Sequence, residues 1–572
     1  MKGTELFVKA LQKEGVDYLF GYPGGYAIDI FDELYKQDSI QMILPRHEQG
    51  LIHAADGYAR ATGRVGVCLV TSGPGATNLV TGIATANYDS VPLVCFTGQV
   101  PTNLIGNDAF QEVDIVGITR SICKYAVTVR RREDLGRIIK EAFYIANTGK
   151  KGPVVVDLPK DIMLEEGDSL YPKQVSIRGY KPSQGVHIGQ IKKATDLLKK
   201  AERPLFLMGG GVTISRGQAE AKKLAEHTGI PVITTIMGRG SLPTDHELYF
   251  GNVGMHGCYA ANKAISDCDL LFSIGTRFND RITGKLGEFA PNAKIIHVDI
   301  DTASISRNIQ VDIPIVADAR DAMEAILKNM PEGEHKEWVA QLKEWDQKHP
   351  IDMPDGEGIN PQKIIREMNR QFEEAIVVTD VGQHQMWVTQ YLEMTEKKQL
   401  LTSGGLGTMG YGLPAALGAQ LGYPDTPVIC VAGDGGVQMT IQEMAMAAAY
   451  ELPVILCIFN NSYLGMVRQW QQLFYDKRYS STCTRRRKSC EGKCKGPGTQ
   501  CPPYAPDFMK LAEGYGAKGM RVEREEDISR AFAFARENRQ GPTVLEFIIQ
   551  SDELVLPMVQ GGQPLSNMIL EC

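Results

Sequence analysis

The sequence predicts an α/β protein with three doubly wound parallel-sheet domains. Length is the first observation: 572 residues exceed what one hydrophobic core organises. The usual domain size of roughly 150 residues suggests three or four domains. The second observation is that short apolar runs of strand length alternate with helix-like segments over most of the chain. This alternation is typical of parallel sheets connected by crossover helices.

The predicted strands fall into three blocks, which are separated by polar stretches near 166–190 and 330–360. We therefore expect domains at 1–168, 186–335 and 360–550, followed by a C-terminal tail at 551–572. The strands are predicted at Ile40–Leu44, Val65–Val70 and Val91–Phe96, at Pro204–Met208, Pro231–Thr235, Leu270–Ile274 and Lys294–Val298, and at Ala375–Thr379, Pro427–Ala432 and Pro453–Phe459.

Composition and charge are those of an ordinary globular protein. Hydrophobic residues make up 43% and charged residues 23% of the chain, and the net charge is −7, from 61 basic and 68 acidic residues. This balance does not favour binding to nucleic acid or to an anionic membrane. The N-terminal segment lacks the apolar core of a signal peptide, and the apolar runs are too short to span a bilayer. We expect a cytoplasmic protein.

An acidic residue and an amide residue follow two successive strands of the third block, at Asp434 and Asn461. The helix between these strands is expected to start at a capping box made by Thr440 and Glu443. A right-handed crossover places both strand ends at one edge of the sheet, where α/β proteins bind ligands. Carboxylate and amide oxygens suit Mg²⁺, with phosphate oxygens completing its shell. Three glycines around the aspartate let a diphosphate approach the backbone: Gly433, Gly435 and Gly436.

These motifs resemble the cofactor-binding signature of thiamine diphosphate enzymes. The resemblance implies that Asp434, Asn461 and the carbonyl of Tyr463 bind the metal. Glycines 405, 407 and 410 also fit the dinucleotide fingerprint G-x-G-x-x-G, but a lone match is weak. The stretch from Ser403 to Gly410 instead resembles the loop that supports the cofactor's aminopyrimidine. Further cofactor contacts implied by the resemblance are Gln383, His384, Gly407 and Met409.

A glutamate follows the strand Ile40–Leu44, at Glu48. Activation of thiamine diphosphate requires a carboxyl group that protonates the pyrimidine ring, and a glutamate with a raised pKa is suited to this task. Glu48 resembles that activating glutamate, although a glutamate at a helix start is also favoured by the helix dipole alone. In this family the glutamate and the diphosphate site belong to different subunits, so the resemblance implies at least a homodimer.

Further motifs make the chain similar to the acetolactate synthases (acetohydroxyacid synthases) from end to end. They are Gly21–Gly25, Ser72–Asn78, Gln99–Pro101, Asp108–Glu112, Asp157–Asp161, Leu464–Val467 and Gln469-Trp470. The resemblance implies catalytic roles for Gly25, Phe110, Gln111, Lys160, Arg281 and Trp470 besides Glu48. Arg281 would anchor the carboxylate of the acceptor and Trp470 would select its size.

The middle block resembles the flavin-binding domain of that family, in which FAD has a structural role. Arg277 would face the phosphates of FAD, and Asp299 or Asp318 would face its adenosine end. The motif Asn279-Asp280-Arg281 has asparagine where the family usually has a first aspartate, which puts one polar contact in doubt. The remaining FAD contacts implied are Gly210, Gly211, Met255 and His256.

The reaction implied is decarboxylation of pyruvate and condensation of the hydroxyethyl group with pyruvate or 2-ketobutyrate. This is the first common step of valine, leucine and isoleucine biosynthesis. Implied partners are further copies of the chain, in a homodimer or tetramer, and a small regulatory subunit. Alternatives that share the cofactor are pyruvate oxidase, glyoxylate carboligase and oxalyl-CoA decarboxylase. A nicotinamide dehydrogenase or a non-enzymatic paralogue leaves Glu48, Asp434 and Asn461 unexplained.

Four cysteines crowd into one basic, glycine-containing stretch with the spacing C-x6-C-x3-C-x6-C: Cys483, Cys490, Cys494 and Cys501. The stretch is an insertion relative to shorter members of the family, so the resemblance assigns it no role. Four thiolates can hold zinc or an iron–sulfur cluster, but the tight C-x2-C pairs of standard zinc motifs are absent. Two disulfides, or reduced thiols in a solvated loop, are the other interpretations.

Overall fold

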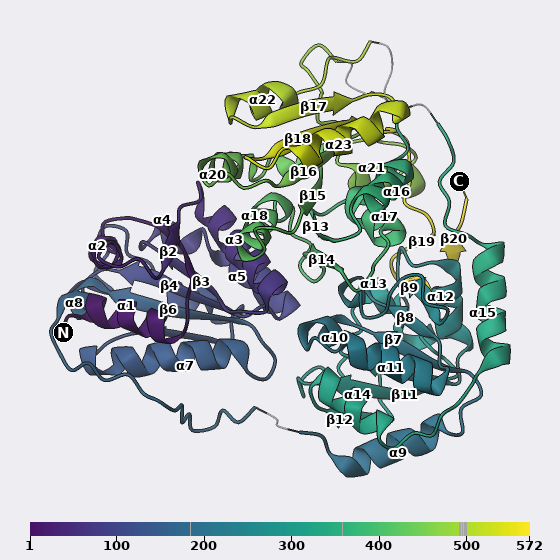
Figure 1. Ribbon diagram of the computed structural model, residues 1–572, viewed down its shortest axis with the longest axis horizontal. Coiled ribbons are helices and arrows are strands. Elements are labelled where there is room, and N and C mark those ends of the chain that lie inside the picture. The colour runs from purple at the N-terminus through teal and green to yellow at the C-terminus, as the bar shows by residue number, and fades with distance from the viewer. Residues whose placement is uncertain (183–184, 357, 491–493, 495, 497–499, 572) are drawn as a thin grey trace.

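Three parallel sheets, each with six strands in the described part of the chain, organise the computed structural model (Figure 1). The structure describes residues 1–182, 185–356, 358–490, 494, 496 and 500–571. Helices cover both faces of each sheet, which is why the strands read as continuous apolar runs. The predicted fold class, three doubly wound parallel-sheet domains, is confirmed.

The first sheet has the strand order β2-β1-β3-β4-β6-β5 and is built from the N-terminal part of the chain. Its strands are β1 (Tyr18–Tyr22), β2 (Gln41–Ile43), β3 (Gly66–Val70), β4 (Leu93–Gln99), β5 (Tyr125–Thr128) and β6 (Pro153–Pro159). Its helices are α1 (Gly3–Lys13), α2 (Ile28–Leu34), α3 (Glu48–Thr62), α4 (Pro74–Thr77), α5 (Val80–Asp89), α6 (Ile115–Thr119), α7 (Leu135–Asn147) and α8 (Lys160–Leu164).

The second sheet has the order β12-β11-β10-β7-β8-β9. Its strands are β7 (Pro204–Met208), β8 (Val232–Thr234), β9 (Tyr249–Asn252), β10 (Leu270–Ile274), β11 (Lys294–Asp299) and β12 (Ile313–Val316). Its helices are α9 (Ile188–Leu198), α10 (Gly210–Ile214), α11 (Gln218–Thr228), α12 (Tyr259–Asp267), α13 (Asp280–Thr283), α14 (Ala319–Leu327) and α15 (Lys336–Lys348).

The third sheet has the order β14-β13-β15-β16-β18-β17. Its strands are β13 (Ala375–Thr379), β14 (Lys398–Thr402), β15 (Val428–Gly433), β16 (Ile455–Asn460), β17 (Lys518–Val522) and β18 (Thr543–Ile548). Its helices are α16 (Pro361–Gln371), α17 (Gln383–Tyr391), α18 (Gly412–Gly422), α19 (Asp434–Val437), α20 (Met444–Ala449), α21 (Gly465–Phe474), α22 (Phe508–Gly514) and α23 (Ile528–Glu537). A short antiparallel pair follows, β19 (Met558–Val559) and β20 (Met568–Ile569).

Two local predictions differ from the structure. The polar stretch 330–360, expected to be a linker, contains the helix α15, which buries Trp338 and Leu342 against the second domain. The capping box expected at Thr440 and Glu443 is wrong, because neither side chain caps this helix. The Thr440 hydroxyl donates to the carbonyl of Gly410 instead, so a tertiary contact has replaced the local one.

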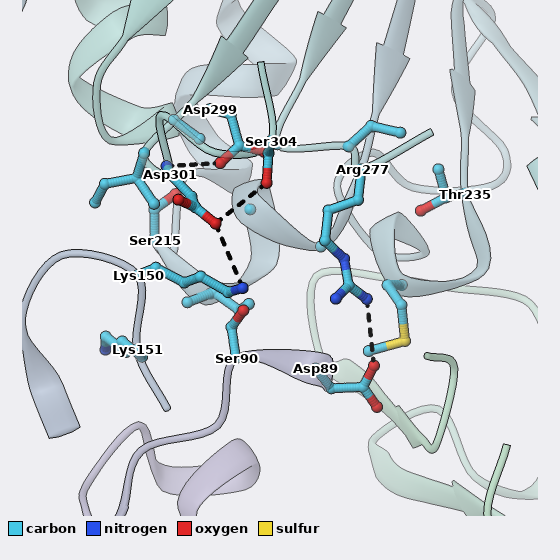
Figure 2. Close-up of a pocket in the computed structure, with 18 of the residues that line it drawn as sticks. Asp89, Ser90, Lys150, Lys151, Ser215, Thr235, Arg277, Asp299, Asp301 and Ser304 are labelled. Carbon is cyan, nitrogen blue, oxygen red and sulfur yellow. Dashed lines mark hydrogen bonds and ion pairs between the residues drawn. The ribbon is translucent and has the colours of Figure 1, made fainter. Parts of the chain in front are cut away.

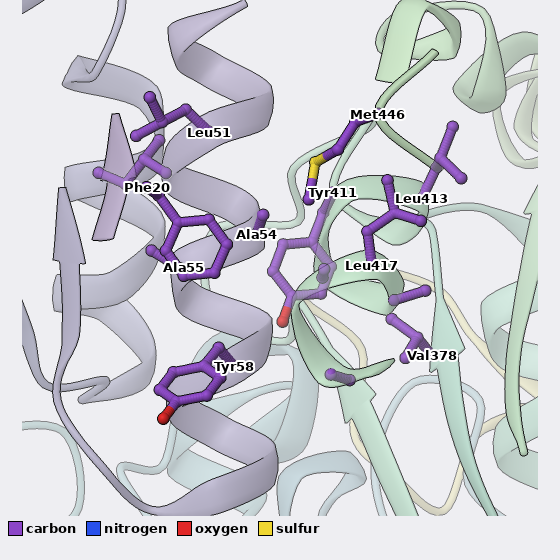
Figure 3. Packing of buried hydrophobic residues seen from close by; sticks show 14 of the residues in the cluster. Phe20, Leu51, Ala54, Ala55, Tyr58, Val378, Tyr411, Leu413, Leu417 and Met446 are labelled. Carbon is purple, nitrogen blue, oxygen red and sulfur yellow. The ribbon is translucent and has the colours of Figure 1, made fainter. Parts of the chain in front are cut away.

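Helices α3 and α18 join the first and third domains by direct backbone packing (Figure 3). A Cβ atom on Gly418 would lie 1.8 Å from the carbonyl oxygen of Ala54, and one on Gly57 would lie 2.0 Å from that of Ala415. Glycine is therefore required at both positions, because any side chain would overlap the facing helix. Buried residues of both domains form one continuous hydrophobic core around this contact.

Among the described residues, no helix combines the length and the apolar character needed to cross a bilayer.

Substitution of Gly418 by alanine tests whether the α3–α18 contact requires a glycine at this position. Overlap with a backbone carbonyl cannot be relieved by a side-chain rotation, so we expect a loss of at least about 3 kcal/mol of stability. The measurement is the midpoint of thermal unfolding of the purified variant. Gly514→Ala is the matched control, because a Cβ at that helical position meets no atom within 4 Å. Equal midpoints for the two variants would contradict this account of the contact.

A buried histidine at the same contact should make the protein sensitive to acid. His53 on α3 is fully buried beside the ring of Tyr411, and burial lowers its pKa from 6.5 to about 3. The unfolded chain therefore binds this proton below pH 6.5 while the folded chain does not. The contribution of neutral His53 to the free energy of unfolding is therefore complete above pH 6.5. It decreases as the pH falls, by at most about 1.4 kcal/mol per pH unit.

We expect the thermal midpoint of the wild type to fall relative to that of His53→Phe as the pH is lowered from 6.5 to 5. Above pH 7 the difference between the two proteins should be constant. A difference that does not change between pH 7 and 5 would show that His53 is not the titrating group.

Candidate functional site

The carboxyl ends of β13, β15 and β16 line a pocket in the third domain. All the described residues that line it come from this domain. The pocket brings together nine of the residues predicted to hold the diphosphate and the metal: Gln383, His384, Met409, Gly433, Asp434, Gly435, Gly436, Asn461 and Tyr463. Parallel strands place these side chains at one edge of the sheet, as the crossover argument requires.

Asp434 is the acid among the described residues that line this pocket, and 3% of its surface is exposed. Burial raises the pKa of its carboxyl to about 7, against the opposing effect of a hydrogen bond from the Thr484 hydroxyl. The oxygen–oxygen distance of that bond is 2.7 Å. An unpaired carboxylate in such a site is costly, and a bound cation would offset the cost.

Asn461 and Tyr463 are held in a fixed arrangement beside Asp434. The amide oxygen of Asn461 accepts from the backbone N–H of Tyr463 at 3.0 Å, and its amide nitrogen donates to Gln383 at 3.2 Å. Ser462 between them adopts a left-handed backbone, with φ of 61°. Asp434, Asn461 and Tyr463 line one pocket, and their carboxylate, amide and carbonyl oxygens are the hard donors that Mg²⁺ prefers.

His384 supplies an independent sign that the pocket fits an anionic group. Its Nε2 atom is buried and has no hydrogen-bond partner among the described residues. Burial lowers the pKa of His384 to about 4, so its ring is neutral near pH 7. A buried ring nitrogen without a partner is the exception in folded proteins, and a phosphate oxygen would satisfy it.

The loop between β14 and α18 is shaped by an acid that sequence analysis missed. Asp380, at the end of β13, accepts the backbone N–H groups of Gly410 and Gly412, each at 2.9 Å. Met409 lines the pocket, whereas Gly407, with φ of 71°, is exposed and does not. Aspartate after a strand is a common residue in any α/β protein, so no local signal identifies this role.

The candidate catalytic residues of the first domain form a separate group. Glu48, the first residue of α3, accepts a hydrogen bond from Asn78 at 2.9 Å. Gln111 packs against the same loop, where a Cβ atom on Gly73 would lie 2.8 Å from its carbonyl oxygen. Phe110 is 78% exposed. None of these residues is among those that line the diphosphate pocket of the same chain.

Gly25 and Lys160, two further candidate catalytic residues of the first domain, are in direct contact. The Lys160 ammonium group donates to the carbonyl of Gly25 at 3.2 Å and lies 3.3 Å from the carboxylate of Asp29. Lys160 therefore holds the loop that contains Gly25, and it does so as the first residue after β6.

Glu443 links the first and third domains just before Glu48. Its buried carboxylate accepts the backbone N–H groups of Arg46 and His47 at 2.9 and 3.0 Å. Burial raises the pKa of Glu443 to about 7, and the nearby charge of Glu48 acts in the same direction. The partner residues lie almost 400 positions away, so the local pattern that suggested a capping box could not reveal this contact.

A second cavity, of about 500 Å³, lies between the second domain and the other two. It is lined by Gly210, Gly211, Arg277, Asp299 and Asp318, which were predicted to contact FAD, and also by Arg281. Gly211 and Gly275 approach so closely that a Cβ on either would lie within about 2.6 Å of the other's Cα. Two buried oxygens on its wall, Oγ1 of Thr276 and Oδ1 of Asn279, have no hydrogen-bond partner among the described residues.

Figure 2 shows the charged side chains that surround this cavity. Arg277 points toward Asp89 of the first domain, 3.8 Å away, and Lys150 lies 3.4 Å from Asp301. Burial raises the pKa of Asp299 to about 6 and also raises that of Asp318, which caps the N-terminus of α14. The cavity thus offers cations for a diphosphate, and acids for the hydroxyl groups of a ribose.

Asp89 was not predicted, yet it contacts all three domains. Its carboxylate accepts from Arg60 at 3.0 Å and from the backbone N–H of Gly404 at 3.2 Å, besides facing Arg277. Asp89 ends α5, a position that carries no motif, so only the tertiary structure reveals it.

Arg281 and Trp470 form a pair across the second and third domains. The guanidinium carbon of Arg281 lies 5.9 Å from the centre of the Trp470 ring, a cation–π distance. Met255 is part of the same arrangement, because Arg281 donates to its sulfur at 3.5 Å. The predicted FAD contacts Met255 and His256 do not line the cavity, and burial lowers the pKa of His256 to about 4.

The cysteine-rich insertion starts beside the diphosphate pocket. Cys483, Cys490 and Cys494 carry free thiols. Within the described ranges, no three cysteine, histidine or acidic side chains lie close enough together to share a metal ion. Cys501 is partly buried. The metal-bound interpretation of the four cysteines stays a prediction.

Comparison with protein families matches each of the three domains. Residues 1–118 match the N-terminal thiamine pyrophosphate (thiamine diphosphate) binding domain, 191–326 the central domain and 380–547 the C-terminal binding domain of thiamine pyrophosphate enzymes. Fold, pocket and matched domains together define a thiamine pyrophosphate enzyme.

Curated relatives show to which family within this class the chain is similar. A probable acetolactate synthase large subunit of Methanococcus aeolicus is 46% identical over 100% of this chain and 95% of its own length. The acetolactate synthase large subunit of Corynebacterium glutamicum is 44% identical over 99% and 90%, and isozyme 3 of Escherichia coli 43% over 98% and 97%. The chain belongs to the acetolactate synthase large subunits, which confirms the relationship predicted from its sequence.

Proposed function

We propose that this chain catalyses the acetolactate synthase reaction, the first common step of branched-chain amino acid biosynthesis. Pyruvate loses carbon dioxide, and the hydroxyethyl group is condensed with a second pyruvate or with 2-ketobutyrate. The observation that carries the proposal is the identity of 43–46% with acetolactate synthase large subunits over essentially the whole chain. The site geometry supports it, because most of the residues expected for the two cofactors line two separate cavities.

Thiamine diphosphate supplies the carbanion chemistry when bound, and the protein supplies position and electrostatic field. In the proposed arrangement Asp434, Asn461 and the carbonyl of Tyr463 hold Mg²⁺. Gln383 and His384 hold the diphosphate. The short distances among these residues, the burial of Asp434 and the unpaired Nε2 of His384 support this assignment.

Glu48 acts as the acid–base group for the aminopyrimidine in this proposal. It lies on the first domain, whereas the diphosphate pocket is lined by the third domain alone. A complete site would then combine Glu48, Gln111 and Phe110 of one subunit with the diphosphate pocket of another. The high exposure of Phe110 supports a homodimer, or a tetramer of such dimers, in which this side chain is covered.

The cavity around Arg277 is proposed to bind FAD in a structural role. Its glycines permit close approach to the backbone, and Arg277 and Lys150 supply positive charge for the phosphates. Arg281 lines the same cavity and also contacts Trp470. We assign Arg281 to the acceptor's carboxylate and Trp470 to the choice between methyl and ethyl acceptors, which a pocket separates by ~1–3 kcal/mol.

The relatives are named large subunits, so a small regulatory subunit is a proposed partner of this chain. The reaction uses small acids of central metabolism, which supports a cytoplasmic location.

The experiment that tests the function is an assay of the purified full chain with pyruvate, thiamine diphosphate and Mg²⁺. Acetolactate, scored as acetoin after acid treatment, should form, and Glu48→Gln should lower turnover by roughly 10²–10⁴-fold, as expected for loss of a general acid–base group. Asp32→Asn, an exposed acid of the same domain, is the control. Oxygen uptake without acetolactate would identify a pyruvate oxidase instead, and full activity of Glu48→Gln would remove this residue from the mechanism.

Arg277→Gln should weaken binding of FAD to the full chain by about tenfold or more, the effect of one hydrogen bond to a charged group. The measurement is the quenching of flavin fluorescence during titration. Lys263→Gln on α12 removes a charge from the same domain outside the cavity and should bind FAD like the wild type. Wild-type affinity in Arg277→Gln would place the flavin elsewhere.

A further inference from the structure

The first described residues of the cysteine-rich insertion form a short antiparallel bridge with the loop that follows β16. Tyr463 pairs with Cys483. The backbone N–H of Leu464 donates to the carbonyl of Thr482 at 2.8 Å, and that of Thr484 donates to the carbonyl of Ser462 at 2.9 Å. The three residues Thr482–Thr484, here named the docking segment, therefore lie directly against the loop that contains Asn461 and Tyr463.

The hydrogen-bond pattern of this bridge fixes the direction of the Tyr463 carbonyl. The two bonds involve the residues on either side of Tyr463, so Tyr463 and Cys483 are a non-hydrogen-bonded pair of an antiparallel ladder. In such a pair the N–H and C=O groups of both residues point away from the partner strand. The N–H of Tyr463 accordingly turns toward Asn461, to whose amide oxygen it donates. Its carbonyl is held on the side away from the docking segment.

The same segment also holds Asp434. The Thr484 hydroxyl donates to Oδ2 of Asp434, with an oxygen–oxygen distance of 2.7 Å. This bond fixes the rotation of the carboxylate about its Cβ–Cγ bond and hence the direction of the second oxygen. Thr484 is partly buried, and its methyl carbon would lie 3.9 Å from a Cβ on Gly435, so the hydroxyl has a defined position in the loop.

We propose that Thr484 is a positioning residue for the metal ligands, and that the docking segment, at the start of the cysteine-rich insertion, is part of the metal site. This inference rests on the proposed assignment of Asp434 and Tyr463 as Mg²⁺ ligands. Two of the three ligands are oriented from the insertion: the carboxylate by the Thr484 side chain and the carbonyl by the bridge. Mg²⁺ demands near-ideal octahedral geometry, whereas Ca²⁺ accepts irregular geometry, so loss of this orientation should affect Mg²⁺ more strongly.

The test is a titration of the full chain with Mg²⁺ at a fixed concentration of thiamine diphosphate, followed by calorimetry, and then the same titration with Ca²⁺. Thr484→Val removes the hydroxyl at nearly constant volume and should raise the Kd for Mg²⁺ about tenfold, the weight of one hydrogen bond to a charged group. The Kd for Ca²⁺ should change less. Thr484→Ser keeps the hydroxyl and should stay within about twofold of the wild type.

Thr482→Val is the matched control. It removes a hydroxyl that donates to Gln471 at 3.0 Å, in the same segment but away from Asp434. Its thermal midpoint can fall, but its Kd for Mg²⁺ should not change. An unchanged Kd for Mg²⁺ in Thr484→Val, or an equal loss for Mg²⁺ and Ca²⁺, would overturn the positioning role.

Asp434→Ala distinguishes this inference from the metal assignment on which it rests. Loss of Mg²⁺-dependent binding in Asp434→Ala, with wild-type behaviour of Thr484→Val, overturns the role of Thr484 alone. Wild-type binding in Asp434→Ala overturns the metal assignment and the inference together.

Discussion

The backbone contact between α3 and α18 is the constraint on which the relative arrangement of the first and third domains depends. Gly57 and Gly418 allow the two helices to touch where any Cβ would overlap a carbonyl group. Glu48 begins α3, and the loop that contains Met409 leads directly into α18. The same contact therefore fixes the candidate acid of the first domain and the cofactor loop of the third relative to each other within one chain.

Buried acids hold loops in place within and between the domains. Asp380 and Asp89 accept backbone N–H groups of loops that border the two cavities, and Glu443 accepts those of the loop that precedes Glu48. A buried carboxylate is costly without hydrogen bonds, so each acid favours the loop conformation that supplies the N–H group it accepts. Rigid loops of this kind suit an enzyme whose cofactor performs the chemistry, because the remaining task of the protein is to position groups accurately.

The sequence predicts the parts of this structure that follow local rules. Apolar runs between turn residues mark most of the strands, and Asp434 and Asn461 follow from strand ends at one sheet edge. Contacts between distant segments leave no such trace. Glu443 has the spacing of a helix cap but binds Arg46 and His47, and Asp89 ends an unremarkable helix. The highly charged stretch before α16 resembles a linker, yet two buried residues, Trp338 and Leu342, make it the helix α15.

The docking segment also explains how the fold carries an insertion at this place. One end of the inserted stretch is held by the bridge at Cys483, and the other by Asp507, which caps α22. The entropy lost in closing a chain segment between two fixed points rises only with the logarithm of its length, by about 0.6 kcal/mol for each doubling. Between these two fixed points, the chain can therefore change in length and composition with little loss of stability of the third domain.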